Sequence, residues 1–170
     1  MKILIINGSP REKSYTQVLA NFTFEYAKTK SDTVKMIDLS QNEIEPFKGL
    51  DINYNQKTKE SVEHMLNADI YLICSPIYNA FFSSAIKNLF EHIDYKKVSN
   101  KKAGFVLMAY GQISFLQVQN QLNSLMNYFS IKSNPKTVNV NHNSFNENMD
   151  LTNEETKTRI QELINSTINL

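Results

Sequence analysis

The sequence predicts an α/β protein built on a doubly wound parallel sheet of five strands, with helices on both faces. Short apolar runs alternate along the chain with five segments whose apolar residues recur at helical spacing. This alternation indicates parallel strands joined by right-handed helical crossovers. With 170 residues, 41% of them hydrophobic, the chain suits one domain over residues 1–170 with a single sizeable core.

The first strand and the first helix have the clearest patterns. Residues 3–6 are four branched apolar residues in a row, which is typical of a strand buried on both faces. The run stops at Asn7-Gly8, a turn signal. An apolar stripe then predicts the first helix, and its members are Tyr15, Val18, Leu19, Phe22 and Tyr26.

Two further strands are predicted before the middle of the chain. Residues 33–39 alternate partly and predict the second strand, while the continuously apolar segment 69–74 predicts the third. Between them lie a long connection, 40–55, and a short helix over 58–66. Connections of that length are often functional or mobile, although packing of Phe47 on the surface explains this one equally well.

The second half of the chain repeats the alternation. A helix over 83–93 is predicted to begin at a cap formed by Ser83 or Ser84. An unbroken apolar strand, 103–109, follows, and a further helix then runs to about Phe129.

The fifth strand is predicted over 132–140, and a final helix is capped by Thr152 or Asn153. The asparagine-rich segment 141–150 between them predicts a solvated loop with His142 exposed. Five such strands most simply adopt the order 2-1-3-4-5. That order places a binding site at the switch point between the first and third strands.

The turn after the first strand has the chemistry of a phosphate cradle. Ser9, Ser14 and Thr16 supply hydroxyl groups. Arg11 supplies a planar fork of donors, and the helix start supplies unpaired N–H groups. Gly8 permits a positive φ and close approach of a ligand to the backbone. The alternative is that Ser14 is only a helix cap and Arg11 a solvated loop cation.

Two more turns are predicted at the same edge of the sheet, over residues 75–80 and 110–112. Pro76 stiffens the first of them, so its backbone amides could be preorganised toward polar atoms of a planar heteroaromatic ring. Tyr78 adds a flat side chain that could pack on such a ring, or could equally be a plain surface aromatic. Gly111 lets a ligand approach the backbone closely.

Composition narrows the class of protein. The chain has 18 basic and 17 acidic residues, and this balance argues against a partner that is a nucleic acid or a membrane surface. The longest apolar stretch, 103–110, is too short to span a bilayer. The three histidines share no ligand spacing, so no metal site is expected.

The chain has a single cysteine, Cys74, which allows no intramolecular disulfide and favours a cytoplasmic setting. Because Cys74 ends an apolar strand, a packed thiol is expected rather than a nucleophile.

Two pairs of motifs carry a resemblance to a known family. They are Gly8-Ser9-Pro10-Arg11 with Ser14-Tyr15-Thr16, and Ser75-Pro76-Ile77-Tyr78-Asn79 with Ala85-Ile86-Lys87-Asn88. Together they resemble the NADPH-dependent FMN reductase family, which includes flavin, azo-dye, quinone and chromate reductases. The resemblance implies a flavodoxin-like fold, with FMN as the bound cofactor and NAD(P)H as the co-substrate.

The resemblance also implies roles for particular residues. The FMN phosphate would be held by Ser9, Arg11, Ser14, Tyr15 and Thr16. The isoalloxazine ring would be lined by Pro76, Ile77, Tyr78 and Asn79. The third turn departs from the glycine-rich serine or threonine loop of many members, and its residues would contact the ring with different donors: Tyr110, Gly111 and Gln112. No side chain is expected to act as a catalytic acid or base.

The resulting hypothesis is an enzyme, an NAD(P)H-dependent FMN reductase. It would pass a hydride from NAD(P)H through bound FMN to a flavin, a quinone, an azo compound or a similar small acceptor. Lys87-Asn88 would start a helix that members often use for dimer contacts, so a homodimer or homotetramer is expected.

Two alternatives remain at this point, an electron-carrier flavodoxin and a non-catalytic flavodoxin-fold binding protein. Carriers of the first kind are usually strongly acidic and lack an arginine in the phosphate loop. The net charge of +1 and Arg11 therefore speak against a carrier.

Overall fold

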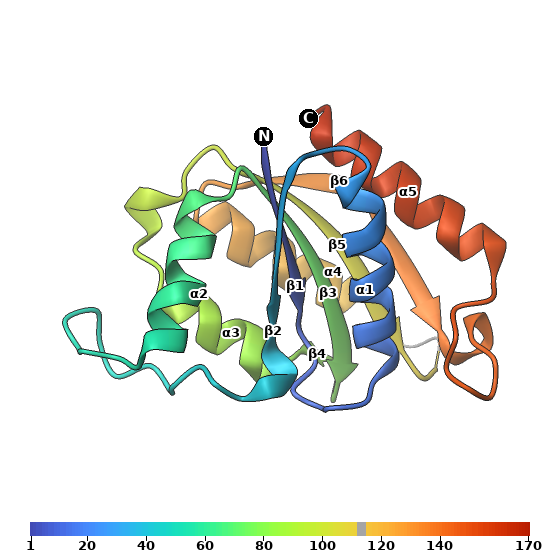
Figure 1. The fold of residues 1–170 in the computed structure, drawn as a ribbon, viewed down its shortest axis with the longest axis horizontal. Coiled ribbons are helices and arrows are strands. Elements are labelled where there is room, and N and C mark those ends of the chain that lie inside the picture. The colour runs from blue at the N-terminus through green and yellow to red at the C-terminus, as the bar shows by residue number, and fades with distance from the viewer. Residues whose placement is uncertain (112–114) are drawn as a thin grey trace.

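The computed structural model describes residues 1–111 and 115–170. In these residues, five long parallel strands follow the order β2-β1-β3-β5-β6 (Figure 1). They are β1 (Lys2–Asn7), β2 (Thr33–Asp38), β3 (Ile70–Tyr78), β5 (Lys102–Ala109) and β6 (Lys132–Asn141). A two-residue strand, β4 (Phe81–Phe82), pairs antiparallel with β3. When β4 is set aside, the order is the predicted 2-1-3-4-5, and the doubly wound α/β fold class is confirmed.

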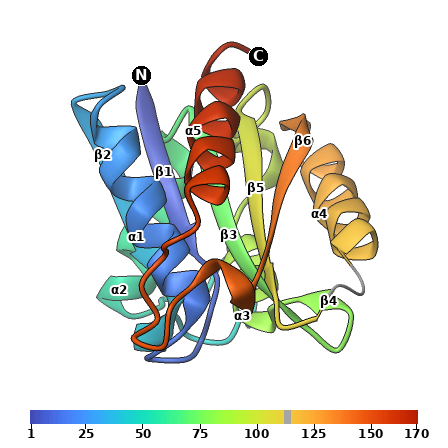
Figure 2. The ribbon, with the colours of Figure 1, turned by 90° about the vertical axis from the view of Figure 1, so that its right-hand side faces the viewer.

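Helices cover both faces of the sheet (Figures 1 and 2). One face carries α1 (Tyr15–Lys28) and α5 (Glu154–Ile168), and the other carries α2 (Gln56–Asn67), α3 (Ser84–Glu91) and α4 (Phe115–Tyr128). Successive strand residues point to opposite faces. Leu4 therefore joins the core under α2, α3 and α4, whereas Ile3 joins the core under α1 and α5. The prediction of a first strand buried on both faces is confirmed.

Side-chain caps fix where three of the helices begin. Ser14, Ser83 and Asn153 each place a side-chain oxygen 2.8–3.3 Å from the backbone N–H of the third residue of α1, α3 and α5 respectively. Of the two pairs of alternatives, Ser84 and Thr152 are therefore not the caps.

Strand β3 is longer than predicted. Ser75 and Pro76 continue the parallel ladder with β5, so the strand ends at Tyr78 instead of Cys74. Proline supplies no N–H to a ladder, which is why the sequence indicated a turn at this position.

A tight hairpin follows β3 in place of the turn expected over 75–80. Asn79 and Ala80 have φ values of 49° and 65°, the left-handed values that a two-residue type I′ turn needs at both positions. Phe81 then pairs with Tyr78. The hairpin was not predicted, because Ala80 occupies a position where glycine is usual.

The segment after β6 is not a solvated loop. A short 3-10 helix, η3 (His142–Ser144), leads to Phe145, which is buried and forms an antiparallel bridge with Leu151. His142 is partly buried because its ring stacks on that of Tyr110. The expectation of an exposed His142 is wrong, since two apolar residues are enough to anchor an otherwise polar segment.

Two other 3-10 helices, η1 (Leu39–Gln41) and η2 (Tyr95–Lys97), lie in the connections. Within the ranges that the structure describes, no helix has the length and apolar character needed to cross a lipid bilayer.

Candidate functional site

The chain leaves β1, β3 and β5 at one edge of the sheet, the lower edge in Figure 1. A cavity of about 390 Å³ lies there. The side chains that line it are Arg11, Lys13, Ser14, Tyr15, Thr16, Pro76, Ile77, Tyr78, Met108, Tyr110 and Met149. Open α/β sheets bind ligands at this switch point, and the volume is that of a small-molecule site.

Side chains beneath the first turn hold its shape. The Asn7 amide donates to the Asp38 carboxylate at 2.7 Å, and its carbonyl oxygen accepts from the backbone N–H of Ser9 at 3.3 Å. The buried Ser9 hydroxyl accepts in turn from the backbone N–H of Arg11 at 3.2 Å. Local side-chain-to-backbone bonds of this kind fix turns. The approach to α1 is therefore ordered before any ligand arrives.

One end of the cavity is rich in donors and positive charge. Ser14 caps α1 by accepting from the N–H of Gln17, and the N–H groups at the very start of a helix have no helical carbonyl to donate to. Two residues with hydroxyl groups, Ser14 and Thr16, and two with cationic groups, Arg11 and Lys13, line the same space. Of the described residues that line the cavity, none is acidic. This end suits a phosphate dianion, which the helix dipole also favours.

Gly8 serves the first turn in a way the sequence did not indicate. Its φ is not positive. A Cβ at this position would lie 2.3 Å from Cδ1 of Ile86 and 2.8 Å from the carbonyl oxygen of Cys74. The Gly8 N–H donates to that same carbonyl at 2.8 Å, and the Ser83 hydroxyl donates to the Gly8 carbonyl. The positive φ that Gly8 permits is therefore not used, and the glycine is needed for close packing against β3 and α3.

The other end of the cavity is aromatic. Tyr78 lies at the end of β3 with its hydroxyl 3.4 Å from that of the buried Ser9, so this side chain is tied to the turn after β1. Pro76 is buried behind it. Tyr110 follows β5 directly and is 75% exposed, so among the described residues this part of the rim faces solvent. Flat side chains around an open mouth suit a planar ring system.

A fourth segment, 142–149, completes the wall. The ring of His142 stacks on that of Tyr110 with centroids 4.4 Å apart and planes 11° apart. Its Nδ1 lies 2.9 Å from the Tyr110 carbonyl oxygen. A carbonyl can only accept, so Nδ1 carries a proton. The rings of Phe145 and Tyr15 pack at 4.5 Å, and Met149 reaches the cavity itself.

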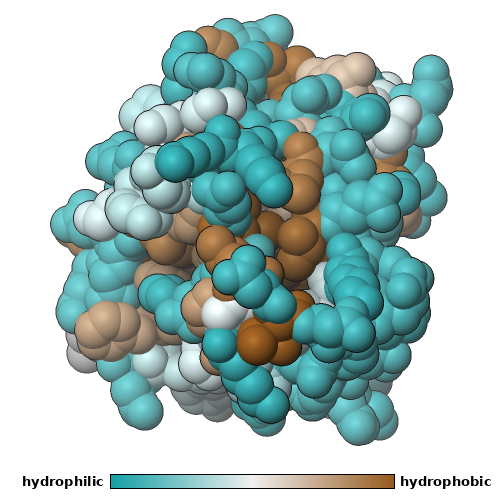
Figure 3. Space-filling view, turned by 90° about the vertical axis from the view of Figure 1, so that its left-hand side faces the viewer, coloured by the Kyte–Doolittle hydropathy of each residue, from teal (hydrophilic) through white to brown (hydrophobic). Residues whose placement is uncertain are grey.

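A second hollow, of about 300 Å³, lies between α2 and the connection before it. Figure 3 looks on the side of the molecule that carries α2 and shows apolar surface gathered in hollows there. Leu50, Ile52, Val62 and Leu66 contribute to this one. It includes no residue of the turns after β1, β3 or β5, so it is separate from the cavity.

Comparison with known proteins agrees with this geometry. The family model described as NADPH-dependent FMN reductase matches residues 1–145. The chain belongs to the NADPH-dependent FMN reductase family. The resemblance seen in the sequence motifs is thereby confirmed.

Two relatives show how similar this chain is to known reductases and how much of each chain the similarity covers. An NAD(P)H-dependent FAD/FMN reductase of Geobacillus thermodenitrificans is 29% identical over 131 residues, which cover 76% of this chain and 71% of the relative. An FMN-dependent NADPH-azoreductase of Staphylococcus aureus is 28% identical over 122 residues, covering 67% of this chain and 63% of the azoreductase. The match therefore spans slightly less than two thirds of the azoreductase.

Solved structures share the fold. An NADH:FMN oxidoreductase, EMOB, in its apo form superposes with a TM-score of 0.78 at 19% identity, covering 98% of this chain and 89% of that one. FerB, an NAD(P)H:acceptor oxidoreductase from Paracoccus denitrificans, also gives 0.78, at 17% identity with 99% and 95% covered. At these identities the likeness supports the flavodoxin-like fold alone.

Most of the residues assigned by the likeness to FMN reductases come together in the structure. Those that line the cavity are Arg11, Ser14, Tyr15, Thr16, Pro76, Ile77, Tyr78 and Tyr110. Ser9 lies behind the turn, Asn79 lies in the exposed hairpin turn, and Gly111 is exposed, so these three do not line it. Gln112 lies outside the described residues.

Three lining residues were not predicted: Lys13, Met108 and Met149. Lys13 belongs to the same turn as Arg11, so its positive charge is the feature of the sequence that could have identified it. Met149 had no signal, because it reaches the cavity from a distant segment. Among the described residues, no three His, Cys, Asp or Glu side chains gather closely enough to hold a metal ion.

Cys74 lies in β3 near the cavity but does not line it. It is fully buried, its Sγ is 3.7 Å from the Thr23 hydroxyl, and burial raises the pKa of the thiol to about 12. We expect iodoacetamide to leave the folded protein unmodified at about pH 8, because the thiolate is the reactive form. Intact mass spectrometry with and without denaturing urea measures this, and the unfolded chain should gain one adduct. Labelling of the folded protein at the rate of the unfolded one would contradict a packed thiol.

Proposed function

We propose that this chain is an FMN-dependent NAD(P)H oxidoreductase that reduces a small acceptor such as a flavin, a quinone or an azo compound. The observation that carries the proposal is the two-ended cavity at the carboxyl edge of the sheet. One end offers hydroxyls, helix N–H groups and two cations, and the other offers flat aromatic side chains around an open mouth. A mononucleotide with a planar ring needs both.

The residues present fit FMN. Arg11, Ser14 and Thr16 would hold the phosphate through charge-assisted and hydroxyl bonds, together with the first N–H groups of α1. Tyr78 and Tyr110 would flank the ring. When bound, FMN supplies the capacity to accept a hydride from NAD(P)H and to pass it to an acceptor.

In this proposal the protein binds the FMN and the substrates and orients them, while the cofactor carries the chemistry. Of the described lining residues, none is a histidine, aspartate or glutamate, and the proposal assigns no carboxylate or imidazole as acid or base. The exposed Tyr110 supports an open mouth at this side of the cavity. Such a mouth admits a nicotinamide and then an acceptor in turn.

We also propose a homodimer or homotetramer in the cytoplasm. Phe81, which is 56% exposed on the hairpin next to the cavity, would suit burial by a second copy. The cytoplasmic setting is supported by the single, buried cysteine.

Anaerobic stopped-flow mixing tests the activity. The protein is loaded with FMN, freed of excess cofactor, and mixed with NADPH or NADH. We expect the visible flavin absorbance to disappear with at least one nicotinamide and to return when a quinone or azo dye is added. Free FMN at the same concentration is the control. Bound FMN that keeps its colour with both nicotinamides would contradict the proposal.

A further inference from the structure

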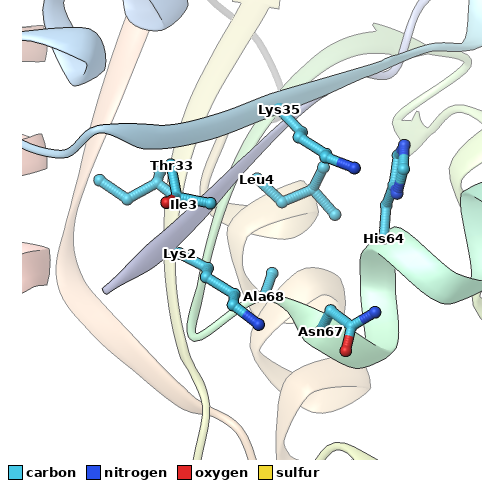
Figure 4. Close-up of a pocket in the computed structure, with 8 residues that line it drawn as sticks. All are labelled: Lys2, Ile3, Leu4, Thr33, Lys35, His64, Asn67 and Ala68. Atoms are coloured by element: carbon cyan, nitrogen blue, oxygen red, sulfur yellow. The ribbon is translucent and has the colours of Figure 1, made fainter.

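A separate hollow of about 250 Å³ lies at the amino-terminal ends of β1 and β2, the edge of the sheet opposite the cavity (Figure 4). Lys2, Thr33 and Lys35 reach it from the strands, and His64 and Asn67 reach it from the end of α2. None of these residues has a part in the function proposed above, so an inference about this hollow does not rest on that function.

Strand pairing explains why these side chains meet. β1 and β2 are parallel, with Lys2 opposite Thr33 and Leu4 opposite Lys35. Alternate residues share a face, so these four side chains all lie on the face that α2 covers. Leu4 is buried and forms the floor together with Ala68, where α2 has ended. An apolar floor is thus surrounded by a polar rim.

The rim carries positive charge from two strands, through Lys2 and Lys35, and a titratable imidazole from α2, that of His64. Lys35 points its ammonium group toward the ring of His64, and the Lys2 ammonium lies on the side of Asn67 (Figure 4). No ion pair found among the described residues includes Lys2 or Lys35. None of the described lining residues is acidic. Asp69 accepts from the backbone N–H of Lys2 at 2.7 Å but does not line the hollow.

We propose that this hollow binds a small organic anion, with its charged group between Lys2, Lys35 and His64 and its apolar part on Leu4 and Ala68. The Asn67 amide and the Thr33 hydroxyl add donors at the rim. An apolar cavity of about 150 Å³ is known to admit benzene. The hollow at about 250 Å³ therefore has room for one ring and an anionic group.

The histidine makes this site sensitive to pH. Burial lowers the pKa of His64, and the positive charge of Lys35 lowers it further, while Glu63 and Glu60 of its own helix act in the opposite direction. Lys2, from β1, is the other charged residue that lines the hollow. A bound anion favours the charged imidazole, so binding should tighten as the pH falls through the pKa of His64.

Nuclear magnetic resonance of the full chain loaded with FMN tests the site. The probe is benzenesulfonate, whose charge stays constant between about pH 5.5 and about pH 7.5, where histidine titrates. We expect saturable shifts of the backbone amides of Leu4, Lys35 and Ala68. The amides of Ser14–Thr16 report on the other cavity. Shifts confined to Ser14–Thr16, or no saturation at Leu4, would overturn the proposal.

Variants and two further probes measure separately how much the charged rim and the apolar floor contribute to binding. The double variant Lys2→Ala/Lys35→Ala should weaken binding about tenfold or more, as expected for lost charge-assisted contacts. Lys97→Ala, an exposed lysine outside the hollow, should leave it unchanged. Sulfate and benzyl alcohol should each bind at least about tenfold more weakly than benzenesulfonate. Equal affinities across the two variants, or across the three probes, would refute the assignment.

His64→Gln is the matched test of the pH dependence. It keeps a polar side chain that does not titrate. Binding at about pH 7.5 should stay close to that of the parent, and the gain at about pH 5.5 should disappear. A variant that retains the full gain would show that His64 does not bind the anion.

Discussion

Gly8→Ala is expected to lower the free energy of unfolding by about 2 kcal/mol, in the range seen for overpacked cores. The added Cβ would meet Cδ1 of Ile86 at 2.3 Å and the Cys74 carbonyl at 2.8 Å. Ile86 is fully buried, and the carbonyl belongs to the central strand β3, so neither can move freely. The turn itself would shift, and FMN affinity should fall with stability. Urea unfolding and fluorescence titration with FMN measure the two effects.

Gly111→Ala is the matched control. A Cβ at Gly111 would meet no atom of the described residues within 4 Å, and its φ is not positive. The same chemical change should therefore leave the unfolding midpoint nearly unchanged. If both variants unfold at the same urea concentration, the close packing of Gly8 does not limit stability.

Arg11→Ala is expected to raise the dissociation constant for FMN about tenfold, which corresponds to about 1.4 kcal/mol. A charge-assisted bond is worth about 1.5–3 kcal/mol when shielded, and the side chain of Arg11 is exposed, so the loss should fall at the low end. The fold should survive, because the backbone N–H of Arg11, not its side chain, makes the bond to Ser9. Equilibrium titration with FMN and thermal unfolding measure the two quantities separately.

Arg159→Ala removes the other arginine, which is exposed on α5. It makes the same change in net charge away from the cavity and should leave FMN affinity unchanged. If Arg11→Ala and Arg159→Ala bind FMN equally well, the phosphate is not held by Arg11.

The fold could be predicted because its signals are local. Residues 3–6 form a continuous apolar run, which predicts both the strand and its burial on both faces. The apolar stripe of α1 predicts the helix but not its buried face: of the five stripe residues only Leu19 is buried, and the buried face consists of Thr16, Leu19, Ala20, Thr23 and Ala27. The extra strand β4 depends on two left-handed residues, Asn79 and Ala80, and alanine gives no local sign of that conformation. The end of β3 was hidden for a related reason, since Pro76 is a turn signal that the ladder with β5 overrides.

The site was predictable where one turn contains it and unpredictable where distant segments meet. The hydroxyls and the cation after β1 lie close together in the sequence, between Asn7 and Thr16, and their chemistry could be recognised together. The need for a glycine at position 8 could not be predicted, because it depends on a close contact with Ile86, which lies in another element. Met149 and the stacking of His142 on Tyr110 depend on contacts that no local pattern encodes.

The wall formed by residues 142–149 bears on how the protein is made. Its contacts with Tyr15 and Tyr110 join early and late parts of the chain across a single cavity. A ribosome releases the amino-terminal turn long before this wall, and chains fold as they emerge. The cavity is incomplete until residue 149 has left the exit tunnel, so we expect the cofactor to load only after that segment has been translated.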